Sequence, residues 1–203
     1  MKHGQRFCDL AYAALSREEM ELAEFAEQTP DDALSIAGIG EAAIIYLIRK
    51  QALRRRICIG WEVSYNKGKD KVDLCVLDDA YRPMASFELK VAFEDPQHGD
   101  WDHVREDVAK HFNPENGIKD CCEDHERYNA LLFISNSNDS KDVIEGKIMK
   151  QIGDLIRPSE FVISHSIKLN RLKNTSRLSE SWNHMRVVVF SGEYVGAQAA
   201  PAS

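Results

Sequence analysis

The sequence predicts an α/β fold: a mixed β-sheet with the element order αβββαβ, flanked by helices and preceded by an N-terminal helical extension. Three observations support this prediction. Residues 57–93 contain three strand-like segments separated by turn-forming residues. A helical pattern follows at 101–112, and an apolar strand-like segment comes next at 130–135. Because a strand, a crossover helix and a second strand form a parallel pair, we expect parallel and antiparallel pairing in one sheet.

The composition is that of a soluble globular domain with an acidic balance. The chain has 203 residues and a formal net charge of −7, which suits one sizeable domain and disfavours a protein that coats nucleic acid through a broad basic surface. No apolar run approaches the length of a membrane span, and the first residues lack the apolar core of a secretion signal. We therefore expect a cytoplasmic protein with no membrane partner.

Helical spacing dominates the first part of the chain. We expect two short helices within residues 6–28, the second opened by a capping box at Ser16-x-x-Glu19. After a break at 29–32, a helix begins at Glu41 and is apolar on almost every side, as a helix buried against a sheet would be. The predicted division of the chain is a helical extension at 1–35, a main domain at 36–195 and a disordered tail at 196–203.

A three-stranded meander is predicted next. Its strands are expected at 57–65, 71–77 and 84–93, with turns between them. Glu62 lies near the middle of the first strand. We expect it to face solvent, with a place beside Asp73 as the alternative.

The second and third strands of this meander carry charges where a buried sheet should be apolar. Glu88 and Lys90 point to the same face of their strand, because side chains alternate along a strand. A hairpin would set Asp73 opposite this pair. Carboxylates about 4 Å apart repel by roughly 4 kcal/mol at an effective dielectric of about 20, and a divalent cation such as Mg²⁺ would remove that repulsion. The alternative is a solvated Glu–Lys pair on an open face.

These residues resemble the motif of the PD-(D/E)xK nuclease superfamily. Asp73 precedes Glu88-x-Lys90 at a strand–turn–strand spacing, and Glu41 lies on an upstream helix. The resemblance covers residues 39–135 and does not single out one family. It departs from the pattern at Val72, where a proline often stands.

The resemblance implies a restriction-endonuclease-like fold and a set of roles. Asp73, Glu88 and the main-chain carbonyl of Leu89 would hold Mg²⁺, for which Mn²⁺ would substitute; Lys90 would be the catalytic lysine, and Glu41 an auxiliary acidic residue and metal ligand. The implied activity is phosphodiester hydrolysis, with DNA as the expected partner. Roles in restriction, phage defence, repair and mobile-element processing all stay open.

Two alternatives compete with a DNA endonuclease. One is a catalytically silent protein of the same fold that binds nucleic acid or serves in assembly, since a fold does not dictate its chemistry. The other is a structural protein in which Asp73 and Glu88 are exposed on different faces. Because one such site cuts one strand, a double-strand break would need two sites, which a homodimer would supply.

The remaining elements are predicted from periodicity alone. The helix at 101–112 has an apolar face of Trp101, Val104, Val108 and Phe112. A later helix aligns Ile144, Ile148, Ile152 and Leu155 and is expected to end at Pro158. Strands are then predicted at 161–169 and 185–191.

Several polar residues have two interpretations. His98, His103 and His111 are each interpreted first as surface or hydrogen-bonded residues, with substrate contact as the alternative. Cys121 and Cys122 lie near His111 and His125, but they lack zinc-ligand spacing, so we favour free thiols in a polar loop. The basic residues of 49–56 would contact nucleic acid, or else stabilise the negative end of a helix. Those of 170–182 would face DNA, or else belong to a solvated loop.

Overall fold

The computed structural model describes residues 3–28, 35–65, 70–95, 101–169 and 182–195. Its helices are α1 (His3–Gln28), the short 3₁₀ helix η2 (Ile36–Gly38), α2 (Glu41–Arg54), α3 (Trp101–Phe112) and α4 (Lys141–Ile152). Its strands are β1 (Ile59–Ser64), β2 (Lys71–Leu77), β3 (Pro83–Phe93), β4 (Glu126–Ser135), β5 (Ile156–Ile163), β6 (Ile167–Lys168) and β7 (His184–Tyr194).

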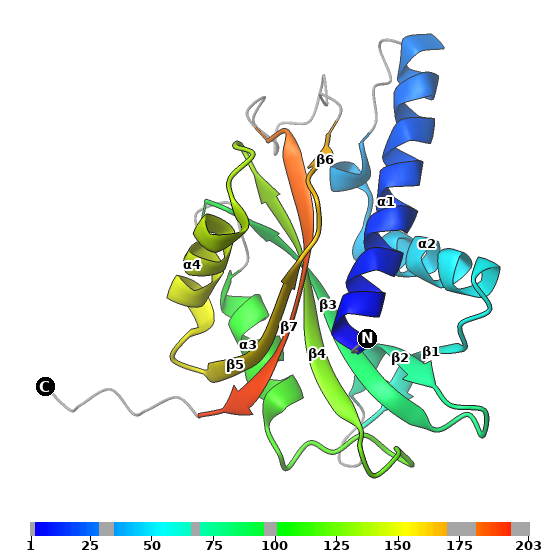
Figure 1. Cartoon of the computed structure of the whole chain (residues 1–203), viewed down its shortest axis with the longest axis vertical. Helices are drawn as coiled ribbons and strands as arrows, with labels where there is room; N and C mark the ends of the chain where they lie inside the picture. Colours follow the sequence, from blue (N-terminus) through cyan, green and yellow to red (C-terminus); the bar gives the residue numbers. More distant parts are fainter. Residues whose placement is uncertain (1–2, 29–34, 66–69, 96–100, 170–181, 196–203) are drawn as a thin grey trace, which may run out of the picture.

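These strands form one mixed sheet in the order β1-β2-β3-β4-β7-β5, with β6 paired to β7 (Figure 1). Strands β3 and β4 are parallel, and the other pairs are antiparallel. Helix α3 is the crossover between the parallel strands. The predicted α/β class, the meander and the mixed sheet are therefore confirmed.

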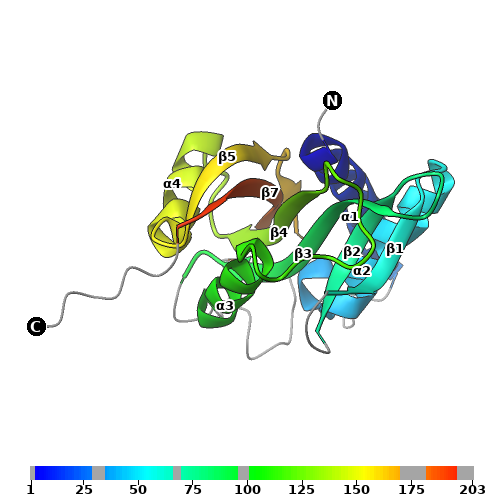
Figure 2. The same ribbon diagram turned by 90° about the horizontal axis from the view of Figure 1, so that it is seen from below.

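Helices cover both faces of the sheet, with α1 and α2 on one side and α3 and α4 on the other (Figures 1 and 2). On the α1 side, aromatic rings stack: the centre of the Phe87 ring lies 3.9 Å from that of Phe7 and 5.1 Å from that of Tyr128. On the α3 side, Val104 and Val108 pack with apolar residues of β4, β7 and α4. A charged side chain at the edge of the sheet, between the two cores, can therefore be contacted by helices of both layers.

The prediction of two short N-terminal helices is wrong, because α1 is continuous. The side chain of Glu19 does not close a capping box with Ser16, whose hydroxyl is buried without a hydrogen-bond partner among the described residues. Instead, Glu19 Oε2 accepts hydrogen bonds from Ser35 Oγ at 3.1 Å and Ile36 N at 2.8 Å. This carboxylate therefore satisfies the start of η2, and nothing interrupts the long helix.

The predicted end of α4 is also wrong. The helix ends at Ile152 with Gly153 as its C-cap, so Leu155 lies beyond it. Pro158 does not stop a helix but lies within β5, where the pairing with β7 is irregular between Pro158 and Glu160. A proline has no N–H to donate, so it is tolerated in a strand where the ladder is broken.

Other boundaries differ by a few residues. Strand β4 begins at Glu126, earlier than predicted, and the strand predicted at 161–169 is divided between β5 and β6. The basic segment at 170–181 and the predicted tail at 196–203 lie outside the described residues. Among the described helices, none combines the length and apolar character needed to cross a membrane.

Candidate active site

Asp73 and Glu88 meet across the β2–β3 hairpin. The register is set by the neighbouring ladder pairs Leu74–Phe87 and Cys75–Ser86. Asp73 and Glu88 are the next residues along the two strands beyond the Leu74–Phe87 pair, and Asp73 Oδ2 accepts a hydrogen bond from Leu89 N at 2.8 Å. Glu88 is only 6% exposed, so the alternative with both acids exposed on different faces does not hold.

Lys90 connects the two helical layers at the end of this site. Its Nζ lies 3.4 Å from both carboxylate oxygens of Glu41, at the start of α2, and 3.1 Å from Asp107 Oδ2, on α3. All three side chains are partly buried, which screens these ion pairs less than pairs on an open surface. The structure therefore brings Glu41, Asp73, Glu88 and Lys90 into one neighbourhood and adds Asp107.

Burial and mutual repulsion make the carboxylates unusual acids. The pKa of Glu88 is raised to about 8, mainly by burial and also by the nearby carboxylates of Asp73 and Asp107, against the lowering effect of Lys110 and Lys90. The pKa values of Asp73 and Glu41 are also raised, in each case mainly by burial. Without a bound cation, the Glu88 carboxyl is therefore protonated at neutral pH.

The pKa of Lys90 is shifted upward, in the direction that keeps its side chain charged. Burial lowers the pKa of Lys90, but the carboxylates of Glu41 and Asp107 outweigh it and raise the pKa to about 12. A lysine of this kind does not accept a proton from water near neutral pH. Its chemical contribution in this arrangement is a positive charge at a set position.

The donor set fits a hard divalent cation. Among the residues that the structure describes, Oε2 of Glu88 is buried without a hydrogen-bond partner, and so is Oδ1 of Asn129, which is paired with Glu88 in the parallel ladder. Buried oxygens without donors are costly, and a cation that accepts carboxylate, amide and water oxygens would satisfy them. Within the described ranges, no group of three or more His, Cys, Asp or Glu side chains is arranged to hold a metal ion. Two carboxylates with an amide oxygen beside them would therefore suit only an ion that keeps several waters, such as Mg²⁺.

Asp107 and Asn129 were missed from the sequence. Asp107 lies in the sheet-facing stripe of α3, three residues after Val104 and one before Val108, both of which are buried. An acidic residue inside an apolar helical stripe is a signal that could have identified it. Asn129 lies in an apolar strand, and only the strand order places it beside Glu88.

His111 is a buried, hydrogen-bonded residue rather than a general base. The Tyr65 hydroxyl lies 2.7 Å from Nδ1 of His111, and Ser86 Oγ lies 3.4 Å from Nε2. Burial lowers the pKa of His111 to about 3, so the ring stays neutral. This contact ties the end of α3 to β3 and thereby holds Asp107 near Lys90. His98 lies outside the described residues, and His103 is exposed on α3.

Glu62 faces solvent, as predicted, and it also lies beside Asp73, which was the alternative prediction. Its side chain is exposed and accepts a hydrogen bond from Lys71 Nζ at 2.9 Å. It also lines a small hollow together with Asp73. Its φ of 50° is unusual for a strand residue, and it coincides with the missing step in the β1–β2 ladder.

The basic residues of α2 and the thiol pair occupy different places. Helix α2 runs through Arg49 and Lys50 and ends at Arg54, where a cation also suits the helix C-terminus. The guanidinium of Arg49 lies 4.4 Å from the centre of the Trp61 ring. Cys122 Sγ contacts Asp78 Oδ2 at 3.5 Å in the region of the β2–β3 turn.

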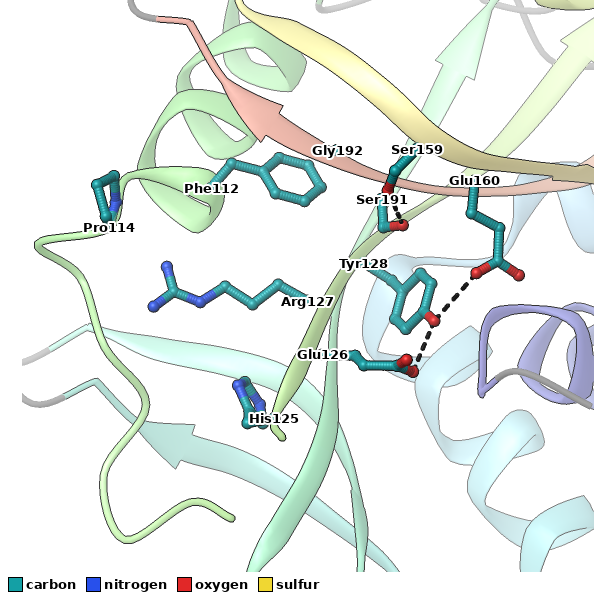
Figure 3. Close-up of a pocket in the computed structure, with 10 residues that line it drawn as sticks. All are labelled: Phe112, Pro114, His125, Glu126, Arg127, Tyr128, Ser159, Glu160, Ser191 and Gly192. Carbon is teal, nitrogen blue, oxygen red and sulfur yellow. Dashed lines mark hydrogen bonds between the residues drawn. The ribbon is translucent and has the colours of Figure 1, made fainter. Parts of the chain in front are cut away.

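A cavity of about 420 Å³ lies elsewhere, along the first residues of β4 and the neighbouring parts of β5 and β7 (Figure 3). The Tyr128 hydroxyl donates to Glu126 at 2.7 Å and also lies 3.2 Å from a carboxylate oxygen of Glu160. Arg127 donates to the main-chain oxygens of His111 and Asn113 and thereby caps the end of α3. None of the predicted site residues lines this cavity.

Comparison with known proteins finds no match: no family model, no curated protein and no solved structure is similar to this chain at a significant level.

Proposed function

We propose that this protein is a metal-dependent nuclease that hydrolyses phosphodiester bonds, with DNA as the expected substrate and a restriction-endonuclease-like fold. The observation that carries the proposal is the convergence of Asp73, Glu88 and Lys90 at one end of a β-hairpin, with Glu41 and Asp107 reaching the lysine from opposite layers. Mg²⁺ is the proposed cofactor, with Mn²⁺ as a substitute.

The chain's own groups divide the work between holding the ion and placing charge. The carboxylates of Asp73 and Glu88 and the Leu89 carbonyl would hold the ion, and Glu88 would lose its proton on binding. When bound, Mg²⁺ would supply Lewis-acid chemistry, polarising the phosphate and acidifying an attacking water. The Lys90 ammonium would offset the charge that develops on the phosphate.

Glu41 and Asp107 act in this proposal through the lysine. Both carboxylates contact Lys90 Nζ and hold it at the end of β3, which preserves its charge and restricts its position. We therefore assign Glu41 primarily to positioning Lys90, while direct metal contact by Glu41 stays a prediction. A homodimer is proposed for double-strand cleavage, because each chain offers one such site.

A cleavage assay tests the proposal. Purified protein would be incubated with supercoiled plasmid, single-stranded DNA and RNA, in Mg²⁺, in Mn²⁺ and in EDTA. We expect cleavage only with a divalent ion and its loss in Asp73→Asn and Lys90→Ala. Lys150→Ala is the matched control, because Lys150 is exposed on α4 away from the site. Undiminished cutting by Lys90→Ala would rule out the mechanism.

One observation favours the catalytically silent alternative. Lys90 is already paired with two carboxylates, so its charge is largely neutralised before any substrate arrives. A protein that binds nucleic acid or assembles without turnover would tolerate this pairing. Binding of DNA with no cleavage under any divalent ion would favour the silent form over the nuclease.

A further inference from the structure

A small hollow adjoins the proposed reaction centre on the α2 side. It has a volume of about 180 Å³ and is lined by residues from three elements: Ala42, Ile45 and Tyr46 of α2, Trp61 and Glu62 of β1, and Asp73 of β2. We call it the Tyr46–Trp61 hollow. It is smaller than the roughly 300–1,000 Å³ of sites for drug-sized ligands, so it suits a single flat ring. Asp73 belongs both to this lining and to the proposed site.

Two aromatic side chains in this hollow are unusually exposed. Tyr46 is 58% exposed and Trp61 is 48% exposed, although large aromatic residues are normally covered. They lie on facing elements, one on a helix and one on an edge strand. Exposed aromatic rings next to a phosphate-binding region are the platforms on which unpaired bases stack.

Positive charge accompanies these rings. The Arg49 guanidinium lies over the Trp61 ring, and its Nε is buried without a hydrogen-bond partner among the described residues. Lys50 and Arg54 continue the positive charge along the same helix, and both are exposed. Such a row of cations is complementary to a phosphate backbone.

The carboxylates of the hollow are already engaged and therefore do not oppose an anionic strand at full strength. Glu62 pairs with Lys71 at 2.9 Å, and Asp73 accepts a hydrogen bond from Leu89 N. What remains open is apolar and aromatic surface with a cation beside it. This combination selects a ligand with a flat aromatic face and a nearby negative charge.

We propose that the Tyr46–Trp61 hollow binds an unpaired nucleobase of the substrate strand next to the cleaved phosphodiester. The inference rests on the proposed nuclease function and names its substrate class: single-stranded or locally unpaired nucleic acid. A paired base presents only its edges to the grooves and buries its faces in the stack, so it could not lie against these rings.

The test measures binding without cleavage. Fluorescence anisotropy in EDTA would compare an oligothymidylate of about ten nucleotides with an abasic strand of the same length, which keeps the phosphates but lacks the rings. We expect the wild-type protein to prefer the oligothymidylate by about 5- to 150-fold, the range that one stacked base supplies. Trp61→Ala should abolish the preference, and Trp61→Phe should retain most of it.

Tyr81→Ala is the matched control. Tyr81 is 75% exposed at the β2–β3 turn and lines no part of the hollow, so its loss should leave the preference unchanged. Equal affinity for the two strands, or the same effect from Trp61→Ala and Tyr81→Ala, would overturn the inference, as would absence of binding to either strand. Base-dependent binding without cleavage would overturn the proposed nuclease activity but support base binding in the hollow. Cleavage without base-dependent binding would support the nuclease activity but overturn base binding in the hollow.

Discussion

Replacing Glu88 with glutamine should change how the stability of the protein depends on pH. Glu88 is buried, and its pKa is raised from the ordinary value of 4.5 to about 8. Between these values the folded protein keeps a proton that the unfolded chain has already released. The free energy of unfolding of the wild-type protein therefore falls as the pH rises through this window and levels off above it. In Glu88→Gln the side chain has no proton to lose, so position 88 should make no pH-dependent contribution to the free energy of unfolding.

The size of the effect follows from the same shift. Each pH unit in the window costs about 1.4 kcal/mol, so the whole window corresponds to about 5 kcal/mol. Water entering the site as Glu88 ionises would reduce this cost. In metal-free buffer at about pH 9 we expect Glu88→Gln to be more stable than wild type by roughly 2–4 kcal/mol, relative to their difference at about pH 5.

Urea unfolding followed by tryptophan fluorescence would measure this difference in EDTA across the pH range. The matched control is Glu62→Gln, because Glu62 is exposed and its hydrogen bond from Lys71 lowers its pKa, which keeps it ionised throughout the window. Adding Mg²⁺ at the alkaline end should stabilise wild type, by about 2.7 kcal/mol at a hundred times the dissociation constant, and should stabilise Glu88→Gln much less. Parallel pH profiles for wild type and Glu88→Gln would refute the reasoning.

Two further substitutions test how the surroundings support the site. Asp107→Asn removes one of the two carboxylates that hold Lys90, and we expect cleavage to slow by about tenfold or more, the equivalent of about 1.4 kcal/mol, while Glu106→Gln on the exposed face of α3 leaves the rate unchanged. Equal rates for these two variants would contradict a positioning role. Glu19→Ala should lower the free energy of unfolding by about 2–4 kcal/mol in urea titrations, because it strands two buried donors at the start of η2. Glu21→Ala, on the exposed side of α1, should have little effect, and a similar loss from both variants would count against the assigned contact.

The strands and the crossover helix were predictable because their signals are local. Alternation of apolar and polar residues identifies β2 and β3, and the spacing of Trp101, Val104 and Val108 identifies α3. The wrong predictions arose where one short sequence pattern is compatible with two different structures. The Ser16-x-x-Glu19 pattern has the form of a helix start, yet Glu19 serves a distant loop. Pro158 has the form of a helix stop, yet it lies in a strand at a broken ladder.

The order of residues was enough to predict that Asp73, Glu88 and Lys90 share one end of a hairpin, because side-chain alternation and a short turn leave few ways to pair two adjacent strands. Asp107 and Asn129 join them only in the folded protein, since residues on a crossover helix and on a parallel strand become neighbours through packing across the sheet. The tertiary structure also decided the protonation of the site. The pKa values of Glu88 and Lys90 depend on burial and on charges from separate elements, and no stretch of sequence encodes that sum.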